Sequence, residues 1–199
     1  MKKIKVFPWI GKNYYTPKTL PHKTLIMGES NYTDENNFNS NLVIECIKDY
    51  LDTNEDQSFS RFATKILRVV LGENTQVDKQ IFWNDIAFYN YVQYLVGNKS
   101  GDRPSFEMWQ KSFEAFEEII NELKPERILV LGKQNWENLL SNIKSNNINI
   151  ENIDEYTIKT NIDNQNIIIG YIVHPSSGGG YFTYKIYHPI AKKIVFENF

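Results

Sequence analysis

Four short runs of apolar residues, each bounded by turn-forming residues, have the pattern of buried strands. Several of them are continuous rather than alternating in polarity, as expected for parallel strands that are covered on both faces. The runs are residues 24–27, 81–88, 127–131 and 167–173. The pattern therefore predicts a central, mainly parallel sheet of four strands.

Helical patterns lie between these runs. In the clearest, residues 105–123, apolar side chains recur at helical spacing and the pattern stops near Pro125. Strands that alternate with crossover helices predict an α/β fold, a three-layer α/β/α sandwich, here as a single domain over residues 1–199. The Asn-rich segment 145–166 is expected to be a loop or a weak hairpin. The other predicted helices are residues 41–51, 59–71 and 134–144, and one after Gly180.

Composition limits which cofactors and partners the protein can have and in which cellular compartment it is expected. The 199 residues are 41% apolar, enough for a full core, and the single cysteine, Cys46, cannot alone build a disulfide framework or a four-thiolate metal or iron–sulfur site. We expect no cofactor and no metal. No apolar run approaches the ~20 residues of a membrane span, so a reducing, cytoplasmic location is expected. Because the formal net charge is −2, any surface that binds nucleic acid must be a local patch of basic residues.

Polar residues suited to binding or catalysis follow or lie within three of the predicted strands. Residues 28–32 (GESNY) follow the first, Asn84 and Asp85 lie in the second, and His174 begins an HPSS segment after the last. Ligands of parallel α/β sheets bind beyond the carboxyl ends of the strands. We therefore expect these segments to converge on one pocket.

The order of these motifs resembles that of the uracil-DNA glycosylase superfamily. In that family a strand bearing an asparagine precedes a helix led by Arg-Pro, a strand ending in a glycine turn, and a His-Pro-Ser loop. The matching segments are IFWNDIAFYNYVQ, the stretch from RPSF to LVLGKQNWENLL, and VHPSS, and they span most of the chain. GESNY, AFYNYVQ and HPSSGGGYF resemble more narrowly a poorly characterised bacterial branch. The resemblance implies a uracil-DNA glycosylase-like fold and DNA as the partner, and we expect a monomer.

The resemblance also implies roles in a base-binding pocket. Such enzymes extrude a nucleotide from the stack and read its base on the Watson–Crick edge. Asn84 would be the base reader, and His174 would support negative charge on the leaving base. Tyr32 would crowd the C5 position of a pyrimidine, Phe38 would stack on the base, and Ser30 lies in the same turn as Tyr32. A purely structural role remains an alternative for three of these residues. Asn84 would then form hydrogen bonds within its strand, His174 would cap a strand, and Phe38 would pack in the core.

The first motif departs from the best-known branch of the family. Ser30 stands where that branch has a water-activating aspartate, and Asn31 stands where it has a proline. Glu29 and Asp85 are the remaining carboxylates that could orient water or balance oxocarbenium charge, and we favour Glu29. A first-turn helix charge is the structural reading of Glu29.

Residues after His174 are expected to face DNA. By resemblance, Ser176 and Ser177 are candidate phosphate ligands, and Tyr181 or Phe182 is the candidate wedge that fills the space of the flipped nucleotide. Lys185 is the nearest following cation.

These features together predict a monofunctional DNA glycosylase that hydrolyses the N-glycosidic bond of a flipped uracil or modified pyrimidine and leaves an abasic site. Its role would be base excision repair or, because the first motif is altered, defence against phage DNA with modified bases. The alternative is a catalytically inactive DNA-binding module of the same fold. A small-molecule hydrolase is disfavoured because the chain has neither a phosphate-binding glycine fingerprint nor a Gly-x-Ser-x-Gly elbow.

Overall fold

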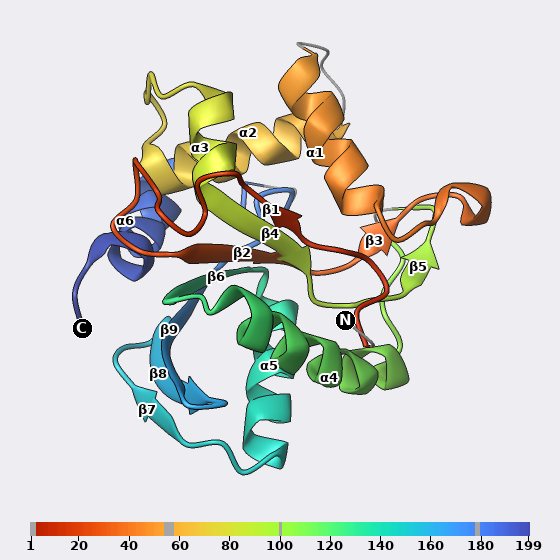
Figure 1. Ribbon diagram of the computed structural model, residues 1–199, viewed down its shortest axis with the longest axis vertical. Helices are drawn as coiled ribbons and strands as arrows, with labels where there is room; N and C mark the ends of the chain where they lie inside the picture. Colours follow the sequence, from red (N-terminus) through yellow and green to blue (C-terminus); the bar gives the residue numbers. More distant parts are fainter. Residues whose placement is uncertain (1–2, 54–57, 100, 178–179) are drawn as a thin grey trace.

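A computed structural model of the chain describes residues 3–53, 58–99, 101–177 and 180–199. Its centre is a seven-stranded mixed sheet, and a separate two-stranded sheet lies beside it (Figure 1). The strands of the large sheet are β1 (Trp9–Ile10), β2 (Thr24–Gly28), β4 (Ile86–Asn90), β6 (Arg127–Leu131), β7 (Ile150–Asn152), β8 (Thr157–Ile162) and β9 (Gln165–Ile172). The small sheet pairs β3 (Asn31–Tyr32) with β5 (Leu95–Gly97).

The strand order of the large sheet is β1-β4-β2-β6-β9-β8-β7. Its middle four strands, β4, β2, β6 and β9, run parallel, whereas β1, β8 and β7 pair antiparallel with their neighbours. The α/β class is confirmed, but the prediction of four strands in all is wrong. The additional strands of the large sheet are β1, which is only two residues long, and β7 and β8, which lie in the Asn-rich segment that was predicted to be a loop or a weak hairpin.

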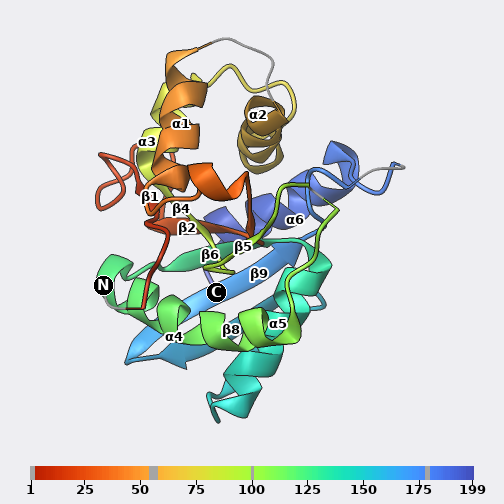
Figure 2. The same ribbon diagram turned by 90° about the vertical axis from the view of Figure 1, so that its right-hand side faces the viewer.

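Helices cover both faces of the sheet (Figure 2). One apolar cluster joins α4 and α5 to one face, and a second joins α1, α2, α3 and α6 to the other. The helices are α1 (Leu42–Asp52), α2 (Ser58–Leu71), α3 (Lys79–Asp85), α4 (Phe106–Leu123), α5 (Lys133–Ser145) and α6 (Tyr184–Phe196), with a 3₁₀ turn at Glu35–Asn37. The molecule therefore has the three layers that the alternating pattern predicts.

Helix α4 shows why the clearest pattern was predictable. The Ser105 hydroxyl accepts a hydrogen bond from the Met108 amide at its start, and Lys124 adopts a left-handed conformation at its end. Trp109, Phe113 and other apolar residues at helical spacing are buried against the sheet. Capping and packing thus agree along the whole helix.

The predicted second strand is wrong in its first half. Residues 79–85 form α3, whose first turn is capped by the Asp78 side chain accepting from the Gln80 amide, and only residues 86–90 form β4. Ile81 is 46% exposed whereas Phe82 and Trp83 are fully buried, which a helix turn permits within an apolar run. Asn84 and Asp85 therefore precede β4 and lie at the opposite edge of the sheet from its carboxyl end.

The Asn-rich segment contains β7 and β8, and β8 forms a hairpin with β9 through Asp163 and Asn164, both at positive φ. The weak-hairpin prediction is therefore the correct one of the two offered. No helix among the described residues is long and apolar enough to cross a membrane.

Candidate functional site

The carboxyl ends of the four parallel strands meet at one edge of the sheet. Gly28 at the end of β2 is in register with Asn90 at the end of β4. On the other side of β2, Leu131 ends β6 opposite Ile172 of β9, and His174 lies two residues further along. The chain leaves β2 for β4 on one side and returns to β6 on the other, so this edge is a topological switch point where α/β sheets bind ligands.

Asn90 occupies the place at this edge that was predicted for Asn84. A Cβ added to Gly28 would lie 2.1 Å from Asn90 Oδ1, so the amide rests directly on the glycine. Asn90 Nδ2 donates to Asn31 Oδ1 at 2.9 Å, and buried Asn31 Nδ2 donates to the Val92 carbonyl at 3.2 Å. The amide of Asn90 is thus fixed in orientation, with its Oδ1 beside Gly28.

Sequence reasoning missed Asn90 although a signal existed. The run IAFYN ends in this residue, in the same way that the run TLIMG ends in Gly28. The strand prediction began five residues too early, so it singled out Asn84 within the run instead of Asn90 at the strand's end.

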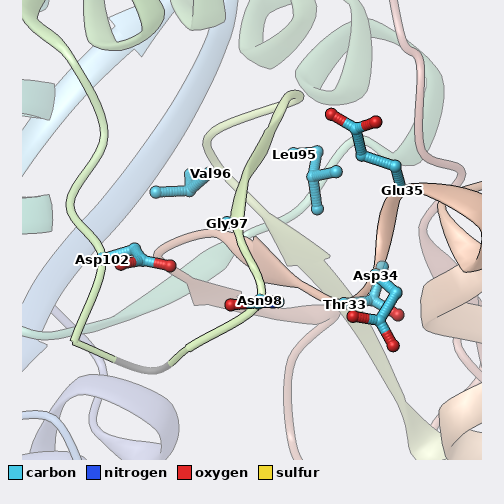
Figure 3. A pocket seen from close by; sticks show the side chains of 8 residues that line it. All are labelled: Thr33, Asp34, Glu35, Leu95, Val96, Gly97, Asn98 and Asp102. Atoms are coloured by element: carbon cyan, nitrogen blue, oxygen red, sulfur yellow. The ribbon is translucent and has the colours of Figure 1, made fainter.

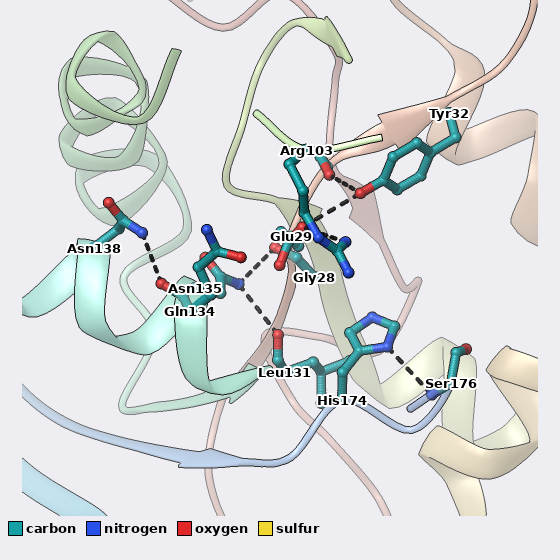
Figure 4. A network of polar contacts seen from close by, with 11 residues as sticks. Gly28, Glu29, Tyr32, Arg103, Leu131, Gln134, Asn135, Asn138, His174 and Ser176 are labelled. Atoms are coloured by element: carbon teal, nitrogen blue, oxygen red, sulfur yellow. Dashed lines mark hydrogen bonds and ion pairs between the residues drawn. The ribbon is translucent and has the colours of Figure 1, made fainter. Parts of the chain in front are cut away.

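Glu29 is the partly buried carboxylate of the site. Its side chain is 13% exposed, Tyr32 donates its hydroxyl to Glu29 Oε1 at 3.3 Å, and Arg103 Nη1 lies 3.6 Å from the same oxygen. Ser30 Oγ donates to the Tyr32 hydroxyl at 2.8 Å. Burial raises the pKa of Glu29, and Arg103 and the hydroxyl groups of Tyr32 and Ser30 oppose that rise. Three predicted residues, Glu29, Ser30 and Tyr32, therefore form one hydrogen-bonded group, of which Figure 4 labels Glu29 and Tyr32.

His174 lies at the same edge and is held on two sides. Its ring stacks on Phe62 of α2, with centroids 5.1 Å apart and planes inclined by 10°. The backbone amide of Ser176 donates to His174 Nδ1 at 3.2 Å. Because Nδ1 accepts this bond, the neutral ring carries its proton on Nε2.

The electrostatic environment keeps this ring neutral. Burial, together with the positive charges of Arg103 and Lys65, lowers the pKa of His174 to about 4. Lys65 Nζ also donates to the Pro175 carbonyl at 2.9 Å, which ties α2 to the loop of His174. In Figure 4 the side chains of Glu29, Arg103 and His174 point toward the same space beyond the strand ends. That space is bordered by a carboxylate and by a neutral N–H donor.

Asn135, in the first turn of α5, lies beneath this edge of the sheet and bonds to the ends of its strands. Its fully buried Nδ2 donates to the Gly28 carbonyl at 2.9 Å and lies 3.4 Å from the Met27 and Leu131 carbonyls. These oxygens belong to the ends of β2 and β6, so Asn135 fixes the spacing between the two strands from which Glu29 and Gly132 continue.

The residues predicted to face DNA are placed unequally. Ser176 is exposed, and the Ser177 amide donates to the His174 carbonyl at 2.9 Å, so both belong to a tight turn beside the site. Tyr181 is 75% exposed, whereas Phe182 stacks on Tyr187 of α6, with ring centroids 5.6 Å apart. Of the two candidate wedges, Tyr181 is the one whose ring is open to solvent. Lys185 is exposed in the first turn of α6.

The structure does not bring Asn84 and Asp85 to the same edge of the sheet as Glu29 and His174. Asn84 Nδ2 donates to the Gln80 carbonyl within α3, and fully buried Asp85 accepts hydrogen bonds from the Lys18 and Thr19 amides at 2.8 and 2.6 Å. Asp85 also accepts from the Thr19 hydroxyl and from Asn13 Nδ2. This carboxylate anchors the loop after β1 at the far edge of the sheet and is not available to orient water at the Glu29 edge.

Phe38 and a hollow beside the small sheet lie outside the group just described. Phe38 is half-buried and packs against the apolar cluster of α1, α2, α3 and α6. A hollow of about 390 Å³ opens by the small sheet, between β5 and the segment after β3 (Figure 3). Its carboxylates belong to Asp34, Glu35 and Asp102, and neither Glu29 nor His174 borders it. The hollow is thus separate from the site at the strand ends.

Two comparisons with known proteins add no relative. No family model matches the chain, and no curated protein is significantly similar to it. Within the described parts of the chain, no three His, Cys, Asp or Glu side chains gather as a metal-binding group.

Proposed function

We propose that this chain is a DNA glycosylase, related to the uracil-DNA glycosylase superfamily, that removes a uracil or another modified pyrimidine from DNA and leaves an abasic site. The observation that carries the proposal is the convergence at one sheet edge of a fixed amide, a partly buried carboxylate and a neutral histidine. These are the groups of Asn90, Glu29 and His174. They come from the segments that carry the resemblance to the superfamily.

In this proposal Asn90 takes the role that the resemblance had assigned to Asn84. Its amide offers an acceptor and a second N–H to the Watson–Crick edge of a flipped base. Asn31 holds one hydrogen of the amide and so fixes which way the acceptor points. A fixed amide discriminates among bases because the wrong edge leaves its polar atoms unpaired.

His174 stabilises the leaving base in the proposed reaction. As the bond between C1′ and the base nitrogen breaks, the electron pair stays on the base, and negative charge develops on its carbonyl oxygen. The Nε2–H of the neutral ring donates to that oxygen, which is stabilisation by a preorganised dipole. The stack on Phe62 and the bond from the Ser176 amide hold the donor in place before the charge appears.

Glu29 completes the hydrolysis in the proposed reaction. Its carboxylate orients a water whose oxygen bonds to C1′, and it takes the proton that the water loses. Arg103 opposes the rise in the pKa of Glu29 that burial causes, and its positive charge favours the ionised carboxylate. Glu29 serves in place of the aspartate that Ser30 replaces.

A base-release assay tests the proposal. Duplex and single-stranded oligonucleotides that carry uracil, 5-hydroxymethylcytosine or its glucosylated form are incubated with the protein and then heated in alkali to reveal abasic sites. We expect strand scission at one of these bases for the wild type, and none for Glu29→Gln. Binding to a modified oligonucleotide without scission would replace the enzyme by the alternative, a catalytically inactive DNA-binding module.

A further inference from the structure

A basic stripe runs along α2 beside the site. Arg61, Lys65 and Arg68 are spaced four and three residues apart, so they lie on one face of the helix. Helix α2 contains no acidic residue, although the whole chain has a formal net charge of −2. Arg61 and Arg68 are exposed, and Lys65 is half-buried. We call these three residues the α2 stripe.

The α2 stripe is attached directly to the candidate site. Lys65, in its middle, donates to the Pro175 carbonyl, and Phe62 on the same helix stacks on His174. At its far end, Arg68 is close enough to the Tyr184 hydroxyl of α6 to oppose the rise in pKa that burial causes there. The stripe therefore follows the rim of the site from the His174 loop to the first turn of α6, where Lys185 is exposed.

The charge is distributed asymmetrically around the site. On the side of the small sheet, the hollow shown in Figure 3 carries the carboxylates of Asp34, Glu35 and Asp102. On the side of α2, the charges are the three positive charges of the α2 stripe. A polyanion that reaches the site would be repelled along the first side and attracted along the second.

We infer that the α2 stripe is the surface on which the sugar-phosphate backbone of DNA lies while a base occupies the site. Arg61 and Arg68 are seven residues apart, which is about 10 Å along a helix and matches about three base-pair steps of a duplex. Both guanidinium groups would contact phosphates, and Lys65 would hold the His174 loop against the same strand. The inference rests on the proposed function and names the partner surface of that site.

Salt-dependent binding tests the inference. Each phosphate contact releases counterions, so the logarithm of the binding constant falls with the logarithm of salt concentration with a slope of about −0.9 per contact on duplex DNA. The test variant is Arg61→Gln with Arg68→Gln, and the control is Lys12→Gln with Lys144→Gln, which removes the same charge from exposed positions away from the stripe. Fluorescence anisotropy with a labelled duplex, carrying either a uracil or only ordinary bases, gives the slopes.

We expect the test variant to lose about two units of slope and, at 0.1 M salt, on the order of 50-fold in affinity, on both duplexes alike, because phosphates carry no sequence information. The control should keep the wild-type slope. Either arginine variant alone should lose about one unit, which preserves the test if the double variant fails to fold.

The failures of the two proposals are distinguishable. Suppose that the wild type releases a base. If the test variant then keeps the wild-type slope, or if the control loses as much slope as the test variant, the inference is overturned while the proposed glycosylase activity is retained. If the wild type binds DNA through the stripe but releases no base, the surface stands and the proposed activity fails. A wild type that does not bind DNA at low salt overturns the inference outright.

Discussion

Gly28→Ala tests the arrangement of the candidate site through one added methyl group. The new Cβ would stand 2.1 Å from Asn90 Oδ1 and 3.1 Å from Phe88 Cζ. Real Cβ atoms do not approach within 3.0 Å of another heavy atom, so the amide of Asn90 must move by about 1 Å. Gly28 has no positive φ that alanine would have to adopt, so the backbone can remain as it is.

The expected cost in stability is small. Moving the amide strains or breaks the hydrogen bond from Asn90 to Asn31, worth about 1 kcal/mol net. Alanine also lowers the conformational entropy of the unfolded chain, which stabilises the folded protein by about 0.4–1 kcal/mol. We therefore expect the free energy of unfolding to change by less than about 1 kcal/mol and the melting temperature to move by about 2–4 °C at most.

The expected cost in activity is large. A displacement of about 1 Å in a group that positions the substrate can cost about 100-fold in rate. Single-turnover base release and thermal unfolding, measured on the same preparation, separate the two effects. Gly101→Ala is the matched control, because a Cβ at Gly101 meets no atom within 4 Å. A Gly28→Ala protein that keeps wild-type activity would refute the reasoning, as would one that is inactive only because it is unfolded.

Three further predictions concern charged groups. Burial and the positive charges of Arg103 and Lys65 lower the pKa of His174 to about 4 from its ordinary 6.5, so between these pH values the unfolded chain binds a proton that the folded chain does not. Stability should therefore fall by up to about 3 kcal/mol as the pH drops from 6.5 to 4, and urea unfolding of His174→Asn should lack this part of the fall. Arg103 holds down the pKa of Glu29, so Arg103→Gln should move the acidic limb of the kcat/KM profile to higher pH; an unmoved limb would show that Glu29 is not the titrating group. Asp85→Ala should lower the free energy of unfolding in urea by about 3 kcal/mol, because buried backbone amides lose their acceptor; a stable but inactive variant would return Asp85 to the active site.

The sequence predicted most of the frame because local and global preferences agree there. Strands β2 and β6 are continuous apolar runs between turn residues. In α4 the capping residue, the apolar positions at helical spacing and the residue that ends the helix follow one another in the sequence. The run IFWNDIAF was ambiguous, because the seven residues of α3 lead directly into the five residues of β4 and no glycine or proline separates them. A short apolar run has no period that separates these two states.

The candidate site was predictable only where it lies within one segment. Glu29, Ser30 and Tyr32 follow one strand, and their mutual contacts are local. The stack of Phe62 on His174 joins residues more than a hundred positions apart, and Arg103 reaches Glu29 from the loop before α4. Such pairings depend on the sheet order, which the apolar pattern does not specify.

The most direct test of the central claim compares two asparagines at opposite edges of the sheet. Asn90 contacts Gly28 at the carboxyl ends of the strands, whereas the side chain of Asn84 donates to the Gln80 carbonyl within α3. The measurement is the single-turnover rate of base release for Asn90→Ala and Asn84→Ala, on the oligonucleotide that the wild type cleaves after alkali. The account predicts at least about a 100-fold loss for Asn90→Ala and a rate within about twofold of wild type for Asn84→Ala. Equal rates in the two variants, or the loss in Asn84→Ala alone, would contradict it.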